Sequence, residues 1–260
     1  MPYATASDGI RLYYEEVGTG EPLLLVSGKG SDHTSWSIVR DDFAHSYHVI
    51  VYDHRGTGQS DKPSEPPYTI SGLAQDAIAI LDHLNIQRAH AYGVSMGGKI
   101  CQCLGIEHAE RIGALVLGCT TSGNAHGVPR SPEVSAMMAS PSIDTQFELM
   151  LSPTWVAAHS ELIASYVSQQ SPLPAYVQNL HSQASEGYDS WDQLPTIKAP
   201  TLVIHGSEDR VVQAANAYLL ADRIPNAELY IVQGGRHGYY LEFREEASRV
   251  VNEFLARHPL

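Results

Sequence analysis

The sequence predicts an α/β fold in which a mostly parallel, doubly wound sheet carries helices on both faces and a small helical cap. Short aliphatic and β-branched runs alternate with amphipathic segments along most of the 260 residues, which is the order that a parallel sheet with crossover helices requires. The alternation stops between about residues 120 and 195. One apolar run leads directly into a glycine-flanked serine, Ser95, and then into a helical segment.

Six runs are predicted as strands of the sheet, because they are short, apolar and bounded by turn residues. The turn Asp8-Gly9 indicates that an antiparallel hairpin precedes them. The six runs are residues 23–27, 48–52, 89–92, 114–117, 201–205 and 228–232.

Helices are predicted between these strands, where apolar residues recur at helical spacing. The clearest one covers residues 70–84, with Ser71 as its candidate N-cap. Others are predicted near residues 36–44, directly after Ser95, and at residues 247–255, where the helix is amphipathic.

The segment of residues 120–195 is predicted to form a helical cap, inserted into an α/β core made of residues 1–119 and 196–260. It contains no strand-like run, and helical patches around residues 147–151 and 157–167 favour a structured insertion. Such an insertion would cover the carboxyl ends of the strands, where open α/β sheets bind their ligands.

Large apolar side chains are the candidate lining of a substrate pocket beneath this cap. A cap also needs apolar packing of its own, so core packing is the alternative role for each of them. The candidates are Trp36, Met137, Met138, Met150, Trp155, Tyr166 and Trp191.

The charge of the chain restricts its classes of partner. The formal net charge is −13, with 29 acidic side chains against 16 basic ones. Nucleic acids and anionic membrane surfaces both require a basic footprint on the protein. We therefore expect a small-molecule substrate and neither of these partners, while the sequence leaves the oligomeric state open.

The sequence gives no support for a metal or an organic cofactor. The 13 histidines are scattered without a zinc-ligand spacing, and no glycine-rich phosphate-binding motif occurs. The three cysteines cannot all pair, and Cys101-x-Cys103 falls on a predicted helix without a second pair. Buried free thiols are therefore expected.

The location expected from the sequence is the cytoplasm. No stretch approaches the roughly 20 apolar residues that span a bilayer. Residues 1–6 lack the basic region and following apolar core of a signal peptide.

Ser95 is the candidate nucleophile. It is the centre of the sequence Gly93-Val94-Ser95-Met96-Gly97, between a predicted strand and a predicted helix. A serine on such a sharp turn projects its hydroxyl above the sheet, and the glycines permit the close backbone approach that the turn demands. The motif alone is weak support, because chance produces it in about one such chain in six.

Two later loops supply the partners that activate a serine hydroxyl. A turn with Glu208 and Asp209 follows one predicted strand, and a glycine-rich loop with His237 follows the next. His237 is the candidate general base and Asp209 is the acid that orients it, with Glu208 as the alternative acid. Each residue alone could have a structural role, but together they follow the chain order Ser, Asp, His.

Five segments carry a resemblance to a known superfamily. They are residues 27–30 with Trp36, the D-x-R-G-x-G-x-S turn at 53–60, the G-x-S-M-G-G elbow at 93–98, the acid loop at 206–210 and the histidine loop at 235–238. Through these segments the chain resembles the α/β-hydrolase superfamily over nearly its whole length. Within it, the chain is most similar to small, cofactor-independent esterases and lactonases of the 3-oxoadipate enol-lactonase type.

The resemblance implies an oxyanion hole made by the backbone N–H groups of Lys29 and Met96. Many relatives have His-Gly in this loop, whereas this chain has Ser27-Gly28 before Lys29. Because backbone groups form the hole, the departure leaves it intact. The Lys29 ammonium has two interpretations, attraction of an anionic substrate or plain exposure to solvent.

The candidate triad and the resemblance together predict a serine hydrolase that cleaves a small carboxylic ester or lactone through an acyl-enzyme on Ser95. The fold hosts many chemistries, so alternatives stay open. They are a carbon-carbon bond hydrolase or lyase with the same triad, and a slow-turnover lactone receptor. Asp53 and Arg55 are expected to brace their turn rather than contact substrate.

Overall fold

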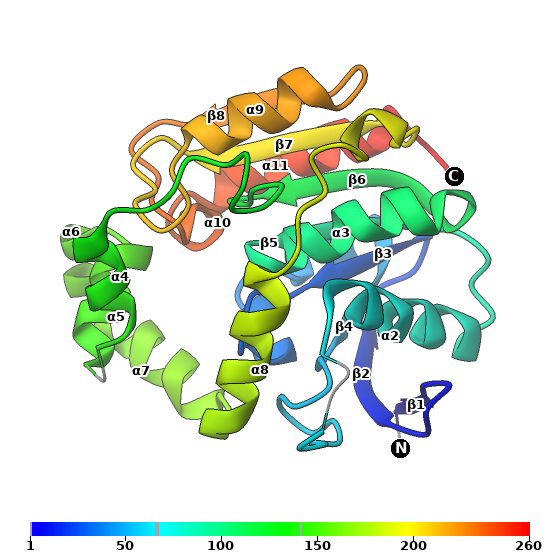
Figure 1. The fold of residues 1–260 in the computed structure, drawn as a ribbon, viewed down its shortest axis with the longest axis horizontal. Coiled ribbons are helices and arrows are strands. Elements are labelled where there is room, and N and C mark those ends of the chain that lie inside the picture. The colour runs from blue at the N-terminus through cyan, green and yellow to red at the C-terminus, as the bar shows by residue number, and fades with distance from the viewer. Residues whose placement is uncertain (1, 66–67, 141) are drawn as a thin grey trace.

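The computed structural model describes residues 2–65, 68–140 and 142–260, and it has the α/β architecture that the sequence predicts (Figure 1). Within these residues, eight strands form one sheet in the order β1-β2-β4-β3-β5-β6-β7-β8. Strand β2 is antiparallel to β1 and β4, and the other neighbouring pairs are parallel. The strand bounds are Tyr3–Thr5 (β1), Arg11–Val17 (β2), Glu21–Val26 (β3), Tyr47–Tyr52 (β4), Ala89–Val94 (β5), Ile112–Gly118 (β6), Thr201–Gly206 (β7) and Glu228–Val232 (β8).

The opening hairpin and the six predicted strands are confirmed. The hairpin turn closes with a 2.9 Å hydrogen bond from the Ala6 N–H to the Ile10 carbonyl, and Gly9 has a positive φ of 86°. Strands β5, β6 and β7 are buried at every residue. Such burial is expected of parallel strands that are covered on both faces.

The helices cover both faces of the sheet. Their bounds are Asp41–Ala44 (α1), Ile70–His83 (α2), Met96–Glu107 (α3), Pro132–Met138 (α4), Ile143–Met150 (α5), Pro153–Ala158 (α6), Ser160–Gln169 (α7), Ala175–Glu186 (α8), Ala215–Arg223 (α9), Tyr239–Glu242 (α10) and Arg244–Ala256 (α11). Helices α2, α3 and α9 pack on one face of the sheet and form one apolar cluster with it. Helices α1 and α11 pack on the other face and form a second cluster. Cys101, Cys103 and Cys119 are free and buried, as predicted.

One predicted helix is shorter than expected, and one predicted N-cap is wrong. The helix expected near residues 36–44 is a 3₁₀ turn at His33–Trp36 followed by the four-residue α1. Helix α2 is capped by Thr69 rather than Ser71, and the Thr69 Oγ1 accepts a 2.9 Å hydrogen bond from the Gly72 N–H. Thr69 has the extended backbone that an N-cap requires, whereas Ser71 already lies inside the helix.

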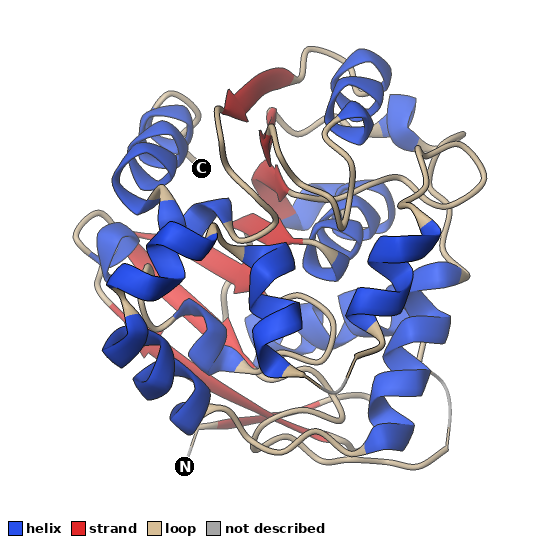
Figure 2. Cartoon of the chain, turned by 90° about the vertical axis from the view of Figure 1, so that its left-hand side faces the viewer, coloured by secondary structure: helices blue, strands red, loops and turns tan. Residues whose placement is uncertain are grey.

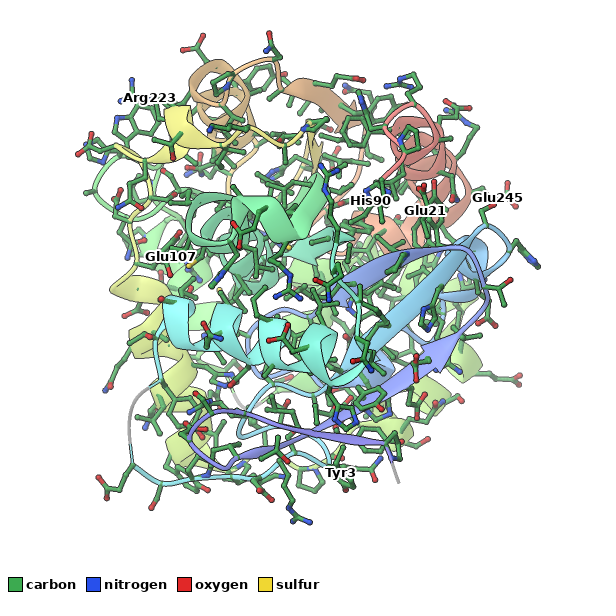
Figure 3. The ribbon with its side chains drawn as sticks, turned by 90° about the vertical axis from the view of Figure 1, so that its right-hand side faces the viewer. Tyr3, Glu21, His90, Glu107, Arg223 and Glu245 are labelled. Atoms are coloured by element: carbon green, nitrogen blue, oxygen red, sulfur yellow. The ribbon has the colours of Figure 1, made fainter. Side chains whose placement is uncertain are left out.

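Helices α4 to α8 occupy the chain between β6 and β7, where the sequence predicts the cap. Figure 1 shows them on the left, beyond the strand ends, and Figure 2 shows that side from the front. Figure 3 shows the opposite side, where Glu21 begins β3 and His90 lies near the start of β5. The stretch is helical as expected, and its division from the core stays a prediction. No helix of the described residues is long and apolar enough to cross a membrane.

The turn after β4 is braced by buried charges, as predicted for Asp53 and Arg55. Asp53 accepts hydrogen bonds from the backbone N–H groups of His33 (2.7 Å) and Gln59 (2.6 Å). Arg55 donates two hydrogen bonds, of 2.7 and 2.6 Å, to the carboxylate of Asp76 on α2. Burial raises the pKa of Asp76, and the adjacent guanidinium opposes that rise.

Replacing Arg55 with methionine is expected to lower the free energy of unfolding by about 3 to 5 kcal/mol, because Asp76 loses its partner while it stays buried. The measurement is the urea midpoint of unfolding. Arg11→Met is the matched control, since Arg11 pairs with Asp61 at the surface, where screening weakens ion pairs. Equal midpoints for the two variants would contradict the prediction.

Candidate active site

Ser95 lies on a strained turn between β5 and α3. Its φ of 56° and ψ of −118° are unusual for a residue that is not glycine. Two contacts hold this backbone in place. The Ser95 N–H donates a 2.9 Å hydrogen bond to the Gly118 carbonyl at the end of β6, and the Thr120 hydroxyl donates one of 2.7 Å to the Ser95 carbonyl. Such strain persists only where the surroundings over-determine the conformation.

The two glycines of the motif are required by close backbone contacts. A Cβ atom on Gly93 would lie 2.2 Å from the Gly97 carbonyl oxygen, and one on Gly97 would lie 2.1 Å from the Val26 carbonyl oxygen of β3. Both distances are far inside van der Waals contact. The close approach predicted for the elbow is therefore confirmed at both positions.

Asp209 and His237 come together on the loops after β7 and β8. The Asp209 Oδ2 lies 2.7 Å from the His237 Nδ1, and both side chains are buried. The Asp209 Oδ1 accepts hydrogen bonds from the backbone N–H groups of Val211 (2.8 Å) and Val212 (2.9 Å). Since a carboxylate can only accept, His237 donates from Nδ1 and leaves its Nε2 as the basic nitrogen.

A second imidazole, which the sequence reasoning missed, also contacts this carboxylate. The Nε2 of His205, inside β7, lies 3.2 Å from the Asp209 Oδ2 and 2.8 Å from the Val212 carbonyl. Burial raises the pKa of Asp209, but the electrostatic effect of the His237 ring and the hydrogen bonds from His205 and His237 outweigh it and leave that pKa well below its ordinary value. The only sequence signal for His205 is a polar residue in an otherwise apolar strand.

Glu208, the alternative acid, has an exposed side chain next to the buried Asp209. The hydrogen bond from the histidine goes to Asp209 instead. The geometry therefore favours Asp209.

Ser95 and His237 line one cavity of about 300 Å³. Both are described residues, and no hydrogen bond joins them in this structure. Such catalytic hydrogen bonds are often long without substrate and tighten in the complex. Most of the cavity wall is apolar and comes from the cap and α10, with contributions from Phe147, Leu149, Met150, Leu151, Tyr166 and Tyr240.

Only some of the predicted pocket side chains line this cavity. Met138, Met150 and Tyr166 do so. The other four predicted side chains pack against neighbouring residues instead of lining the cavity. Trp36 is fully buried against Tyr92 and Tyr240, Met137 joins a small cluster with Val134, Trp155 stacks on His159, and Trp191 stacks on His126 beneath Arg223.

The predicted oxyanion loop passes directly beside the nucleophile. A Cβ atom on Gly28 would lie 3.5 Å from the Ser95 Cβ. The Lys29 N–H donates to none of the described residues, and the N–H of Met96, as the first in α3, has no partner within the helix. Both groups are thus free to bind an oxyanion.

The Lys29 side chain is half-buried, so the interpretation that it is plainly exposed to solvent is wrong. Its Nζ donates a 3.1 Å hydrogen bond to the Ser182 hydroxyl on α8. Burial lowers the pKa of the Lys29 ammonium, and the nearby charge of Arg130 lowers it further. The cap helix covers this side chain, which a reading of the loop alone did not anticipate.

One cluster of described residues has the composition of a metal site. Ligand atoms of Asp32, His33 and Asp53 all lie within 4.8 Å of one another. These atoms already have protein partners, because Asp53 bonds both the backbone and the ring of His33, and Asp32 accepts a 3.0 Å hydrogen bond from the Thr34 N–H. The cluster is explained as part of the loop structure, and the lack of a metal requirement stays a prediction.

The family of the chain follows from a match between its sequence and a family model. Residues 21–155, which contain the elbow and the oxyanion loop, match the family model of the α/β hydrolase fold. The chain belongs to the α/β-hydrolase family. The predicted superfamily and fold class are thus confirmed, and this α/β hydrolase has hydrolases among its relatives.

Three relatives cover nearly the whole chain of this α/β hydrolase. It is 32% identical over 269 residues to a 2-hydroxy-6-oxononadienedioate/2-hydroxy-6-oxononatrienedioate hydrolase of Burkholderia vietnamiensis, with 95% of this chain and 92% of the relative covered. A solved N-acyl homoserine lactone degrading enzyme is 33% identical with a TM-score of 0.85, covering 98% of this chain and 100% of its own. The enol-lactonase of Burkholderia xenovorans LB400 is 26% identical with a TM-score of 0.84 and the same coverage.

Proposed function

We propose that this α/β hydrolase cleaves a small carboxylic ester or lactone through an acyl-enzyme on Ser95. The observation that carries the proposal is the buried 2.7 Å contact between Asp209 and His237 beside the cavity that Ser95 lines. A buried carboxylate that accepts from Nδ1 holds the imidazole in the tautomer whose Nε2 can take a proton. His237 then acts as base toward the Ser95 hydroxyl.

The proposed reaction has two halves. Ser95 attacks the carbonyl carbon while His237 accepts the hydroxyl proton, and the protonated imidazole then gives that proton to the departing alkoxide. In the second half, His237 takes a proton from water as the water attacks the acyl carbon, and it then gives that proton to the Ser95 oxygen as the acid leaves. Asp209 orients the imidazole and stabilises its charged form in both halves.

Charge that develops on the carbonyl oxygen would be bound by the backbone N–H groups of Lys29 and Met96. One such donor typically contributes about 2.7 to 4 kcal/mol to lowering the barrier. The strained φ of Ser95 supports this role, because it places the sharp strand-to-helix turn of a nucleophile elbow directly before Met96, the first residue of α3.

Two of the relatives named above act on lactones, which supports cleavage of a carboxylic acyl bond. The relative from Burkholderia vietnamiensis supports a second candidate, hydrolysis of a carbon-carbon bond with the same three residues. The cavity that Ser95 and His237 share, about 300 Å³, is at the lower end of the range of small-molecule sites. A small acyl group is therefore expected.

Steady-state hydrolysis of a panel tests the proposal. The panel contains aryl esters of increasing acyl length, simple lactones, an enol lactone and a vinylogous 1,5-diketone. We expect multiple turnovers with the short esters or lactones, and a decline as the acyl chain exceeds the cavity. Turnover of the diketone alone would replace the ester proposal by carbon-carbon cleavage. A single turnover that leaves Ser95 acylated would favour the receptor alternative.

A further inference from the structure

A second, polar cavity of about 470 Å³ lies between α4, α8 and the start of α9. A narrow cavity of about 70 Å³ lies next to both, since its wall includes Ser95 of the apolar cavity and Asn124 and Arg130 of the polar one. Ser95 therefore lies in the wall of the apolar cavity and in the wall of the narrow one.

Three cations line the narrow cavity, Lys29, Lys99 and Arg130. Lys99 lies in the first turns of α3, four residues after Ser95, and both residues line this cavity. The three charges are close enough for Arg130 to lower the pKa of both lysines, after the larger effect of burial. Such a cluster is unexpected in a chain whose formal charge is −13.

Lys99 is buried, with 5% of its surface exposed, and its hydrogen bonds are incomplete. Its Nζ donates at 2.6 Å to the Ser185 carbonyl, and among the described residues it has no second acceptor, although an ammonium has three N–H donors. Burial lowers its pKa to about 8. A buried ammonium without a counter-ion is costly, so an anion in this cavity would satisfy it.

The neighbouring acidic side chains do not supply that counter-ion. Glu186 and Asp189 raise the pKa of Lys99 without contacting it, and both side chains are exposed, although Glu186 also lines the narrow cavity. Among the described residues, no carboxylate lies within salt-bridge distance of any of the three cations. Arg130 instead contacts the Met138 sulfur.

We propose that Lys29, Lys99 and Arg130 bind a carboxylate of the substrate. The preferred substrate is then an ester or lactone with a free carboxylate a few bonds from the scissile carbonyl. Its apolar part lies in the first cavity and its carboxylate in the narrow one. The inference rests on the proposed function only for the identity of the bond that is cleaved.

Calorimetric binding to the Ser95→Ala protein tests the inference without turnover. The probes are methyl hydrogen glutarate, a monoanion, and dimethyl glutarate, its neutral counterpart. Hydrogen bonds to charged groups predict that the monoanion binds about 10 to 100 times more tightly. Equal binding, or no binding of the monoanion, overturns the inference.

Charge-removing variants locate the effect. Adding Lys99→Met to Ser95→Ala is expected to abolish the preference for the monoanion, and adding Arg130→Met is expected to weaken it. Arg130→Met also replaces Lys99→Met if that variant does not fold. Lys198→Met is the matched control, because Lys198 is exposed and precedes the amino end of β7, whereas Ser95 follows the carboxyl end of β5. A preference that survives in both Lys99→Met and Arg130→Met overturns the inference.

The two proposals fail separately. Wild-type rates for 4-nitrophenyl hydrogen glutarate and 4-nitrophenyl valerate are compared for this purpose. Hydrolysis of both esters without a preference for the anion, in rate and in binding, overturns the carboxylate site and leaves the ester hydrolase. Selective binding of the monoanion with hydrolysis of neither ester supports the carboxylate site and overturns the ester hydrolase.

Discussion

Ser95→Ala is expected to lower kcat for the best ester or lactone by about 10⁶-fold, the loss seen when the serine of a subtilisin triad is removed. The reason is that alanine offers no atom that can form the acyl-enzyme. The measurement is single-turnover and steady-state hydrolysis at saturating substrate, compared with the wild-type protein. Labelling by a fluorophosphonate should disappear in the same variant.

The fold should survive the Ser95→Ala change, because the hydrogen bonds that hold the elbow use only the backbone of this residue. We expect a melting temperature within a few degrees of the wild type. Ser71→Ala, in an exposed position on α2, is the control for serine removal and should retain full activity. Retained turnover in Ser95→Ala would exclude the elbow serine as nucleophile.

Asp209→Asn is expected to lower kcat by about 10⁴-fold, by analogy with the same change in a serine-protease triad. An asparagine amide can donate to the His237 Nδ1 and so favour the tautomer whose Nε2 carries the proton and cannot act as a base. The depressed pKa of Asp209 means that the native side chain is ionised at neutral pH. The measurement is kcat at neutral pH with the best substrate of the panel.

Glu208→Gln is the matched control for Asp209→Asn, because it removes a carboxylate from the neighbouring residue of the same loop. It should leave kcat within about twofold, since exposed substitutions away from special contacts have small effects. Loss of activity in Glu208→Gln, with an unchanged rate in Asp209→Asn, would move the acid role to Glu208.

The elbow and the sheet could be predicted because their determinants are local. Gly93 and Gly97 are needed for contacts within a few residues of Ser95 and with β3, and such contacts leave a motif in the sequence. The strands leave continuous apolar runs because both faces of the sheet are covered. The turn with two acids after one strand and the glycine-rich loop after the next then indicated Asp209 and His237.

The contents of the cavities could not be predicted, because they depend on how the cap packs against the core. Trp36 and Met150 are both bulky and apolar, yet one is core and the other lines the cavity. His205 and Lys99 are polar residues that matter to the site because they are buried. Their burial cannot be read from the sequence. Lys99 in particular looks like an ordinary helix residue until Ser185, far along the chain, is placed beside it.

The backbone contacts of the elbow set an order for the recovery of activity on refolding. The nucleophile takes its geometry from Val26 of β3 and Gly118 of β6, so the central strands must pair before Ser95 is aligned. Its proposed acid and base lie on the loops after β7 and β8, the last two strands along the chain, and non-local strand pairing is slow. An intermediate in which β3, β5 and β6 have paired but β7 and β8 have not would have Ser95 in its native conformation and would still be inactive. Catalysis would then report the final stage of assembly rather than the collapse of the core.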